Sequence, residues 1–139
     1  MNNNIFTAAA VGDIEYIVSS ISKGMNINNV SETGWTLLMY AVENERKEVV
    51  EFLLNHGADV NFQSFGGWTP LHQAVDASID GTIQTGGKQG EEPVDMIEYL
   101  LDNGADVDIK DSRGLSPIDI AKSYNSKKII QVLEQNKRN

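Results

Sequence analysis

One short sequence pattern occurs twice in this chain and constrains its fold more than any other feature. Residues 34–38 (GWTLL) have a counterpart in residues 67–71 (GWTPL), and the two threonines are 33 residues apart. Gly24 and Gly57 are also 33 residues apart, whereas Gly57 and Gly104 are 47 apart. A fixed period of about 20–50 residues indicates stacked copies of one supersecondary unit. The chain therefore consists of repeated units, one of which carries an insertion of 14 residues.

Each unit shows the pattern of two helices followed by a turn. Residues 48–54 carry a broad apolar stripe at helical spacing, and residues 96–101 repeat it. Each stripe stops before a glycine, Gly57 or Gly104, which suits the left-handed backbone that commonly ends a helix. Polar, glycine-containing segments follow and predict turns. The pattern predicts an all-α fold in which the helix pairs must stack, because no pair can bury its apolar face alone.

The repeat resembles the ankyrin family. Residues 69–74 read TPLHQA, and that family has a period of about 33 residues with a Thr-Pro-Leu-His-x-Ala signature. The resemblance covers nearly the whole chain and implies a solenoid of four helix-turn-helix units with projecting turns. The units are residues 1–30, 31–63, 64–110 with the insertion at about 78–91, and 111–139. Leu37, Met39 and Asp119 depart from the signature, which weakens local contacts and not the fold prediction.

The two end units carry polar residues where the inner units carry leucine. Ser20 in the first unit corresponds to Leu53, and Glu134 in the last unit corresponds to Leu54. Terminal repeats need a polar outer face to remain soluble. We therefore expect one complete small solenoid that is a monomer when free.

Composition excludes several classes of function. The chain has no cysteine, which removes disulfides, thiolate nucleophiles and cysteine-ligated metal. Its 20 acidic and 11 basic residues give a net charge of −9, which disfavours nucleic acid and anionic membranes. It lacks an apolar run of about 18 residues, and residues 1–5 lack the features of a secretory signal. We expect a cytoplasmic protein without a cofactor.

Catalytic constellations are missing from the sequence. Neither His56 nor His72 has a serine or cysteine partner at motif spacing, so we expect no enzyme activity. In ankyrin repeats, the residue matching His72 joins the helix start to the neighbouring turn by hydrogen bonds. Residues 81–89 resemble a phosphate-binding loop only superficially, because Gln89 stands where Ser or Thr is needed.

The insertion leaves two alternatives open. We expect a glycine-containing loop that starts after a helix ending near Ala77 and is either functional or disordered. Acidic residues at its two ends could offer oxygen ligands to calcium, although a calcium-loop motif is missing. These residues are Asp76, Asp80, Glu91, Glu92 and Asp95.

The resemblance also implies where a partner binds. In ankyrin proteins, the turn tips and the first helix of each pair form a concave binding face. The matching positions here are Glu32, Thr33, Trp35, Glu43, Asn44, Phe65, Trp68, Asp76, Arg113 and Tyr124. Large aromatic residues surrounded by carboxylates have the composition of a binding hot spot. The alternative is that Trp35 and Trp68 only pack against adjacent turns.

These observations favour a non-enzymatic protein-binding module. Residues 1–121 carry a net charge of −13, so we expect a protein partner with a basic or amphipathic surface. Residues 68–86 resemble a subset of short bacterial ankyrin proteins that are suspected immunity proteins for secreted toxins. We therefore expect binding that inhibits a toxin. The alternatives are a regulatory or scaffold subunit that binds without inhibiting, and small-ligand or metal binding at the insertion.

Overall fold

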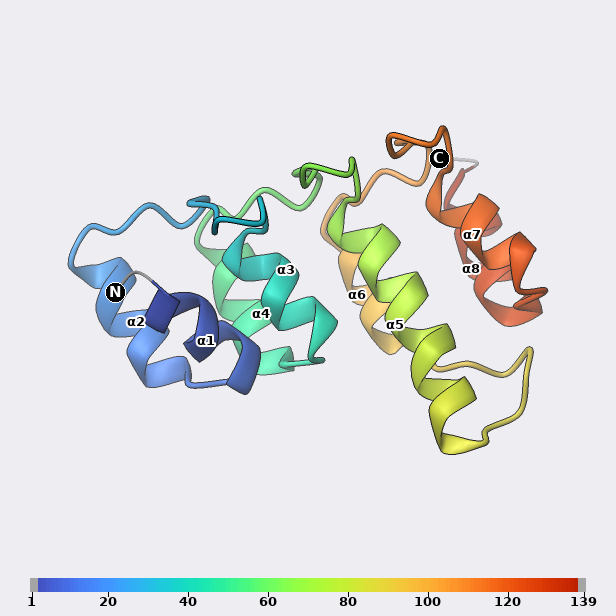
Figure 1. The fold of residues 1–139 in the computed structure, drawn as a ribbon, viewed down its shortest axis with the longest axis horizontal. Helices are drawn as coiled ribbons and strands as arrows, with labels where there is room; N and C mark the ends of the chain where they lie inside the picture. Colours follow the sequence, from blue (N-terminus) through green and yellow to red (C-terminus); the bar gives the residue numbers. More distant parts are fainter. Residues whose placement is uncertain (1–2, 138–139) are drawn as a thin grey trace.

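The computed structural model describes residues 3–137. Within that range the chain forms eight α-helices arranged as four pairs (Figure 1), which confirms the all-α prediction. The helices are α1 (Asn3–Val11), α2 (Ile14–Ser22), α3 (Leu37–Glu43), α4 (Lys47–Asn55), α5 (Pro70–Thr85), α6 (Asp95–Asp102), α7 (Pro117–Ser123) and α8 (Lys127–Lys137).

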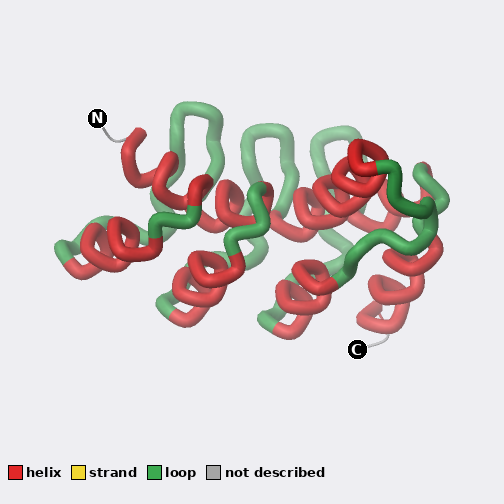
Figure 2. Tube along the Cα trace, turned by 90° about the horizontal axis from the view of Figure 1, so that it is seen from below, coloured by secondary structure: helices red, strands yellow, loops and turns green. Residues whose placement is uncertain are grey.

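The first helices of the four pairs form one row. Helix α1 packs on α3, α3 packs on α5, and α5 packs on α7, while each also packs on the second helix of its own pair. One apolar cluster extends through all four pairs and includes Ala9, Leu38, Leu71 and Ile118 in the first helices. Three turns project side by side from one edge of the stack (Figure 2). The structure is therefore the predicted ankyrin-type solenoid.

A polar cap sets the start of the first helix in units two, three and four. Thr36, Thr69 and Ser116 have extended backbone and accept a hydrogen bond from the backbone N–H three residues later. In two units the third helical residue returns a bond, because His72 or Asp119 accepts from the backbone N–H of the capping residue. These capping boxes satisfy backbone donors that a helix start leaves open.

The three projecting turns share one backbone geometry. In each, a backbone N–H donates to the carbonyl four residues later, over 2.8–2.9 Å. The donor and acceptor pairs are Ser31 with Trp35, Ser64 with Trp68, and Asp111 with Leu115. Each turn contains a glycine with a φ of 83° to 85°, a left-handed conformation that side chains disfavour. The Gly-Trp-Thr pattern of units two and three, and Gly-Leu-Ser in unit four, thus encode a turn that leads directly into a capped helix.

Asparagine side chains join neighbouring units near the ends of the second helices. Each asparagine accepts a backbone N–H from the next unit and donates its side-chain N–H to a glycine carbonyl there, over 2.8–3.3 Å. Asn28 makes these bonds to Asp59 and Gly57, and Asn61 makes them to Asp106 and Gly104. The polar residues between units therefore add specific bonds to the apolar stack.

The prediction that the insertion begins as a loop near Ala77 is wrong. Helix α5 continues to Thr85, and the loop occupies residues 86–94. Ile79 is buried in the core, so the extra turns gain apolar contacts that offset the helix cost of Gly81, about 1 kcal/mol. Gly86 caps the end of the helix with a left-handed φ of 74°.

The loop after α5 packs back on the solenoid. The Ser78 hydroxyl donates to the Pro93 carbonyl, and the Gln89 amide donates to the Tyr124 carbonyl over 2.8 Å. Val94 is buried at the start of α6. The loop is thereby held between α5 and unit four.

None of the helices in residues 3–137 is long and apolar enough to cross a membrane.

We predict that Gly67→Ala lowers the free energy of unfolding more than Gly114→Ala does. Both place a side chain on a left-handed residue of the same turn, which costs about 1–2 kcal/mol. Only at Gly67 would the added carbon lie 2.7 Å from the Ser112 backbone nitrogen in the next turn. Urea unfolding should give Gly67→Ala an additional loss of about 1 kcal/mol or more. Equal losses would contradict close packing between these two turns.

Candidate protein-binding face

His72 connects two units through both ring nitrogens. Its Nδ1 atom accepts the Thr69 backbone N–H over 3.1 Å, and its Nε2 atom lies 2.9 Å from the Leu115 carbonyl oxygen, to which it donates. The side chain is fully buried, and burial lowers the pKa of His72 below 6.5. The hydrogen-bonding role expected from the resemblance is confirmed, and both nitrogens are occupied by it.

Asp111 organises the turn of unit four. Its buried carboxylate accepts from the Trp68 indole over 3.0 Å, from the Leu115 backbone N–H over 3.0 Å, and from the Arg113 guanidinium over 2.9 Å. Burial alone would raise the pKa of Asp111, but these donors hold it well below its usual range. The sequence analysis missed this residue. The signal for it was an aspartate at the position that Ser31 and Ser64 occupy in the other turns.

The two tryptophans are half-buried, and each packs within the turn region. The Trp68 ring is stacked on His72 with centroids 6.0 Å apart, in addition to its bond to Asp111. The ring centroids of Trp35 and Tyr40 are 5.1 Å apart. The Tyr40 hydroxyl in turn donates to the Ser31 hydroxyl oxygen over 2.9 Å. Both rings therefore have structural contacts, as the alternative interpretation expected. Their contribution to partner binding stays a prediction.

Phe65 is the large aromatic residue that the turns expose most. Its side chain is 77% exposed, although it rests on the preceding turn. A methyl group on Gly34 would lie 2.6 Å from the Phe65 ring, so the ring covers this glycine closely. An aromatic ring that packs on the protein with one face and exposes the rest to solvent is suited to contact a partner.

Carboxylates gather at the end of α3 and along the extended α5. We call Glu43, Asp76 and Asp80 the acidic patch, because their charges act on one another across units two and three. Burial and then the charges of Asp76 and Asp80 raise the pKa of Glu43. Burial and then the charge of Asp80 raise the pKa of Asp76, whereas the charge of Arg113 lowers it. The two ion pairs of the described residues, Lys88–Glu91 and Arg113–Asp111, do not include these three. Apart from the weaker attraction between Arg113 and Asp76, no ion pair of the described residues offsets this negative charge.

The ten predicted site residues separate into two groups. Glu32, Thr33, Trp35, Phe65, Trp68 and Arg113 belong to the projecting turns. Glu43, Asn44 and Tyr124 lie at the opposite ends of α3 and α7, and Asp76 lies in the middle of the extended α5. The prediction did not include Asp80, because the insertion was expected to be a loop there. One turn of helix beyond Asp76 places Asp80 beside it.

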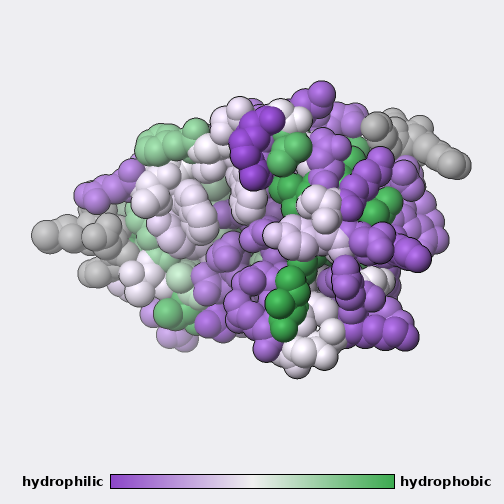
Figure 3. All heavy atoms as spheres, turned by 45° about the vertical axis from the view of Figure 1, so that its right-hand side comes forward, coloured by the Kyte–Doolittle hydropathy of each residue, from purple (hydrophilic) through white to green (hydrophobic). Residues whose placement is uncertain are grey.

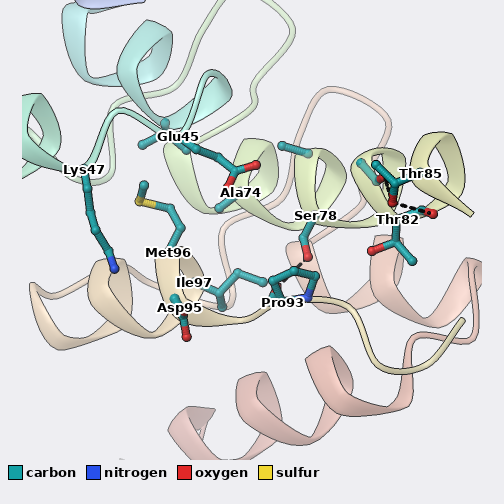
Figure 4. Close-up of a pocket in the computed structure, with 13 residues that line it drawn as sticks. Glu45, Lys47, Ala74, Ser78, Thr82, Thr85, Pro93, Asp95, Met96 and Ile97 are labelled. Atoms are coloured by element: carbon teal, nitrogen blue, oxygen red, sulfur yellow. Dashed lines mark hydrogen bonds between the residues drawn. The ribbon is translucent and has the colours of Figure 1, made fainter. Parts of the chain in front are cut away.

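A hollow of about 390 Å³ opens between units two and three, where the extended α5 passes the start of α4 (Figure 4). Val42, Ala74 and Met96 contribute apolar walls, and Lys47 and Asp95 lie at the rim. The Ser78 and Thr85 hydroxyls of its walls donate to carbonyls of the chain itself. Glu45, Lys47 and Asp95 also line the hollow, and the ion pairs of the described residues include none of them.

The acidic residues around the insertion do not converge on a point. Within residues 3–137, there is no group of three or more His, Asp or Glu side chains placed to hold a metal ion. Glu91 pairs with Lys88 over 3.2 Å on the surface, whereas Glu92 is buried. The calcium alternative gains no support from this geometry.

Comparison with known proteins agrees with the repeat architecture. The family model described as Ankyrin repeats (3 copies) matches residues 5–84, and the one described as Ankyrin repeat matches residues 66–112. Parts of the chain are also similar in sequence to curated proteins of varied kinds.

Three of these relatives illustrate the range. The 2-5A-dependent ribonuclease of Homo sapiens is 48% identical over 59 residues, which cover 42% of this chain and 8% of that protein. The NAD-capped RNA hydrolase NUDT12 of Homo sapiens is 41% identical over 69 residues, 49% and 15% of the two chains. The potassium channel AKT1 of Arabidopsis thaliana is 39% identical over 64 residues, 46% and 8%. The matched segments thus span under a fifth of each relative's length.

We predict that His72 makes stability depend on pH. Its pKa is lowered in the folded protein, so the unfolded chain takes up a proton more readily as the pH falls below 6.5. The free energy of unfolding should therefore be highest above pH 7 and fall between pH 7 and 5. Urea unfolding across this range should show the fall in the wild type and in the His56→Gln control. A His72→Asn variant that kept the same pH dependence would contradict this assignment.

Proposed function

Because this chain belongs to the ankyrin repeat family, we propose that it is a protein-binding module and not an enzyme. The observation that carries the proposal is the acidic patch, which joins carboxylates of two units and lacks an ion-pair partner among the described residues. Groups that repel one another in the free protein are stabilised when a partner supplies the opposite charge.

The partner that fits this face has a basic or amphipathic surface. The chain has a net charge of −9, and the exposed Phe65 offers an apolar contact at the turn tips. Long-range attraction between opposite charges accelerates association and selects among partners. The proposal includes a cytoplasmic monomer that binds neither nucleic acid nor membranes.

We further propose that binding inhibits the partner, as an immunity protein inhibits a toxin. The support is the resemblance of residues 68–86 to short bacterial ankyrin proteins of that suspected role. A rigid acidic face could cover a basic active site by surface contact alone. In the alternative, a regulatory or scaffold subunit, the partner keeps its activity when bound.

We predict that neutralising the acidic patch weakens partner binding without harming the fold. The test variant is Glu43→Gln, Asp76→Asn, Asp80→Asn, and the control is Glu48→Gln, Glu51→Gln, Glu98→Gln on exposed positions of α4 and α6. Both remove three negative charges, so net charge is matched. The test variant should lose about tenfold or more in affinity, equivalent to about 1.4 kcal/mol. Its free energy of unfolding should stay equal or rise by about 0.5 kcal/mol or less per site.

The measurement starts with affinity capture from the cells that produce the chain, followed by titration of the dominant captured protein. Wild type and control should bind it alike, and added salt should weaken both complexes. Equal affinity of the test variant would contradict the acidic patch as the binding surface.

We predict that the captured protein loses its activity when the chain is added at equal concentration. The physical reason is that a partner bound on the acidic patch would have its basic surface covered. Activity assays with and without the chain, with the test variant as control, check this. If the partner kept its activity in a saturated complex, the inhibition proposal would be wrong and the scaffold alternative would be favoured.

A further inference from the structure

Glu92 is a carboxylate buried without full compensation. Its side chain is 2% exposed, and its Oε2 atom accepts the Gly90 backbone N–H over 3.1 Å. Its Oε1 atom is buried and has no hydrogen-bond partner in the part of the chain that the structure describes. A buried carboxylate normally takes a positive partner or several donors, because losing its hydration is costly. Glu92 therefore retains an unused capacity to bind a cation.

A hollow of about 230 Å³ lies beside this carboxylate. It is formed by the extension of α5, the loop at residues 86–94 and the end of α7. Besides Glu92, its lining residues are Ile79, Thr82, Ile83, Gly87, Gln89 and Tyr124. The bond from the Gln89 amide to the Tyr124 carbonyl holds the loop against unit four and keeps the hollow formed. The insertion thus builds this site together with the neighbouring repeat.

The lining of the hollow combines an apolar part, which includes Ile83 and Tyr124, with Glu92. Ile83 is 63% exposed and Tyr124 is 45% exposed, so both side chains are open to a ligand. On the face that brings this part of the molecule forward, small hydrophobic groups lie among hydrophilic side chains (Figure 3). A ligand that fits both parts has an apolar stem and a positively charged end.

The described part of the chain pairs no such group with Glu92. The nearest basic residue in sequence, Lys88, pairs with Glu91 at 3.2 Å, and the ion pairs of residues 3–137 do not include Glu92. A water molecule could satisfy Oε1 but would not neutralise the charge. Lysine and arginine side chains combine methylene stems with N–H donors and positive charge.

We propose that this hollow, the Glu92 socket, receives a lysine or arginine side chain of the protein partner. The stem lies between Ile83 and Tyr124, and the ammonium or guanidinium group donates to Glu92 Oε1. The proposal rests on the proposed protein-binding function and gives the partner's basic surface one anchoring side chain. Tyr124 belongs to the binding face expected from the sequence, so the socket extends that face.

The experiment is a titration of the ¹⁵N-labelled full chain with capped Ala-Lys-Ala and Ala-Arg-Ala peptides, followed by NMR. The backbone amides of Gly87 and Gly90 report on the loop and on the bond to Glu92. Saturable shifts at these amides are expected with both peptides. A capped peptide with uncharged norleucine in place of lysine should give shifts at least about tenfold weaker at equal concentration.

Two variants and one control locate the binding. Glu92→Gln should reduce affinity at least about tenfold, whereas Glu91→Gln, on the exposed neighbouring carboxylate, should bind as the wild type does. Ile83→Ala changes an exposed side chain, so it keeps the fold and should weaken binding a few-fold through lost stem contact. If Glu92→Gln alters the fold, the Ile83→Ala variant tests binding in the hollow instead.

Failure of the socket is distinguishable from failure of the proposed function. Peptides that shift neither amide, or that bind Glu92→Gln and Ile83→Ala as tightly as the wild type, overturn the socket. If the partner is nevertheless captured through the acidic patch, the protein-binding function stands. Peptide binding that survives the acidic-patch substitutions supports a separate socket.

Discussion

Contact between successive helix pairs is the constraint on which the rest of this structure depends. A single pair has an apolar face that it cannot cover, so each unit is stable only against its neighbours. The buried cluster runs from Ile5 in α1 to Leu133 in α8 without a break into separate cores. Polar bonds then fix the register, among them the bond from His72 to the Leu115 carbonyl one unit further along. The proposed binding face is the surface that this stacking leaves along the first helices and turns.

The insertion alters the surface without interrupting the stack. Helix α5 keeps its contacts to α3 and α7, and the added residues project beyond them. This extension contributes Asp80 to the acidic patch, and the following loop contributes Glu92. Both carboxylates lie where the free protein does not neutralise them with an ion pair in its described part. Residues that lower the stability of a free protein in this way are commonly retained for binding.

The sequence was sufficient to predict the helix pairs and the turns, because those features repeat with a fixed period. The role of His72 followed from the resemblance to the ankyrin family. Features that occur once were harder to predict. Gly81 and Gly86 suggested a loop, yet Gly81 lies inside α5, since burial of Ile79 against the stack outweighs its weak helix preference. The burial of Glu92 likewise depends on packing between the loop and unit four, which no local pattern encodes.

Hydrogen exchange of the backbone amides, measured with and without the captured partner, tests the central claim most directly. If the partner binds across the acidic patch and the Glu92 socket, protection should increase at the ends of α3, α5 and α7 and in residues 86–94. Helices α2, α4, α6 and α8 should exchange as in the free protein. Protection concentrated on these second helices would contradict the account and place the partner on the opposite side of the stack.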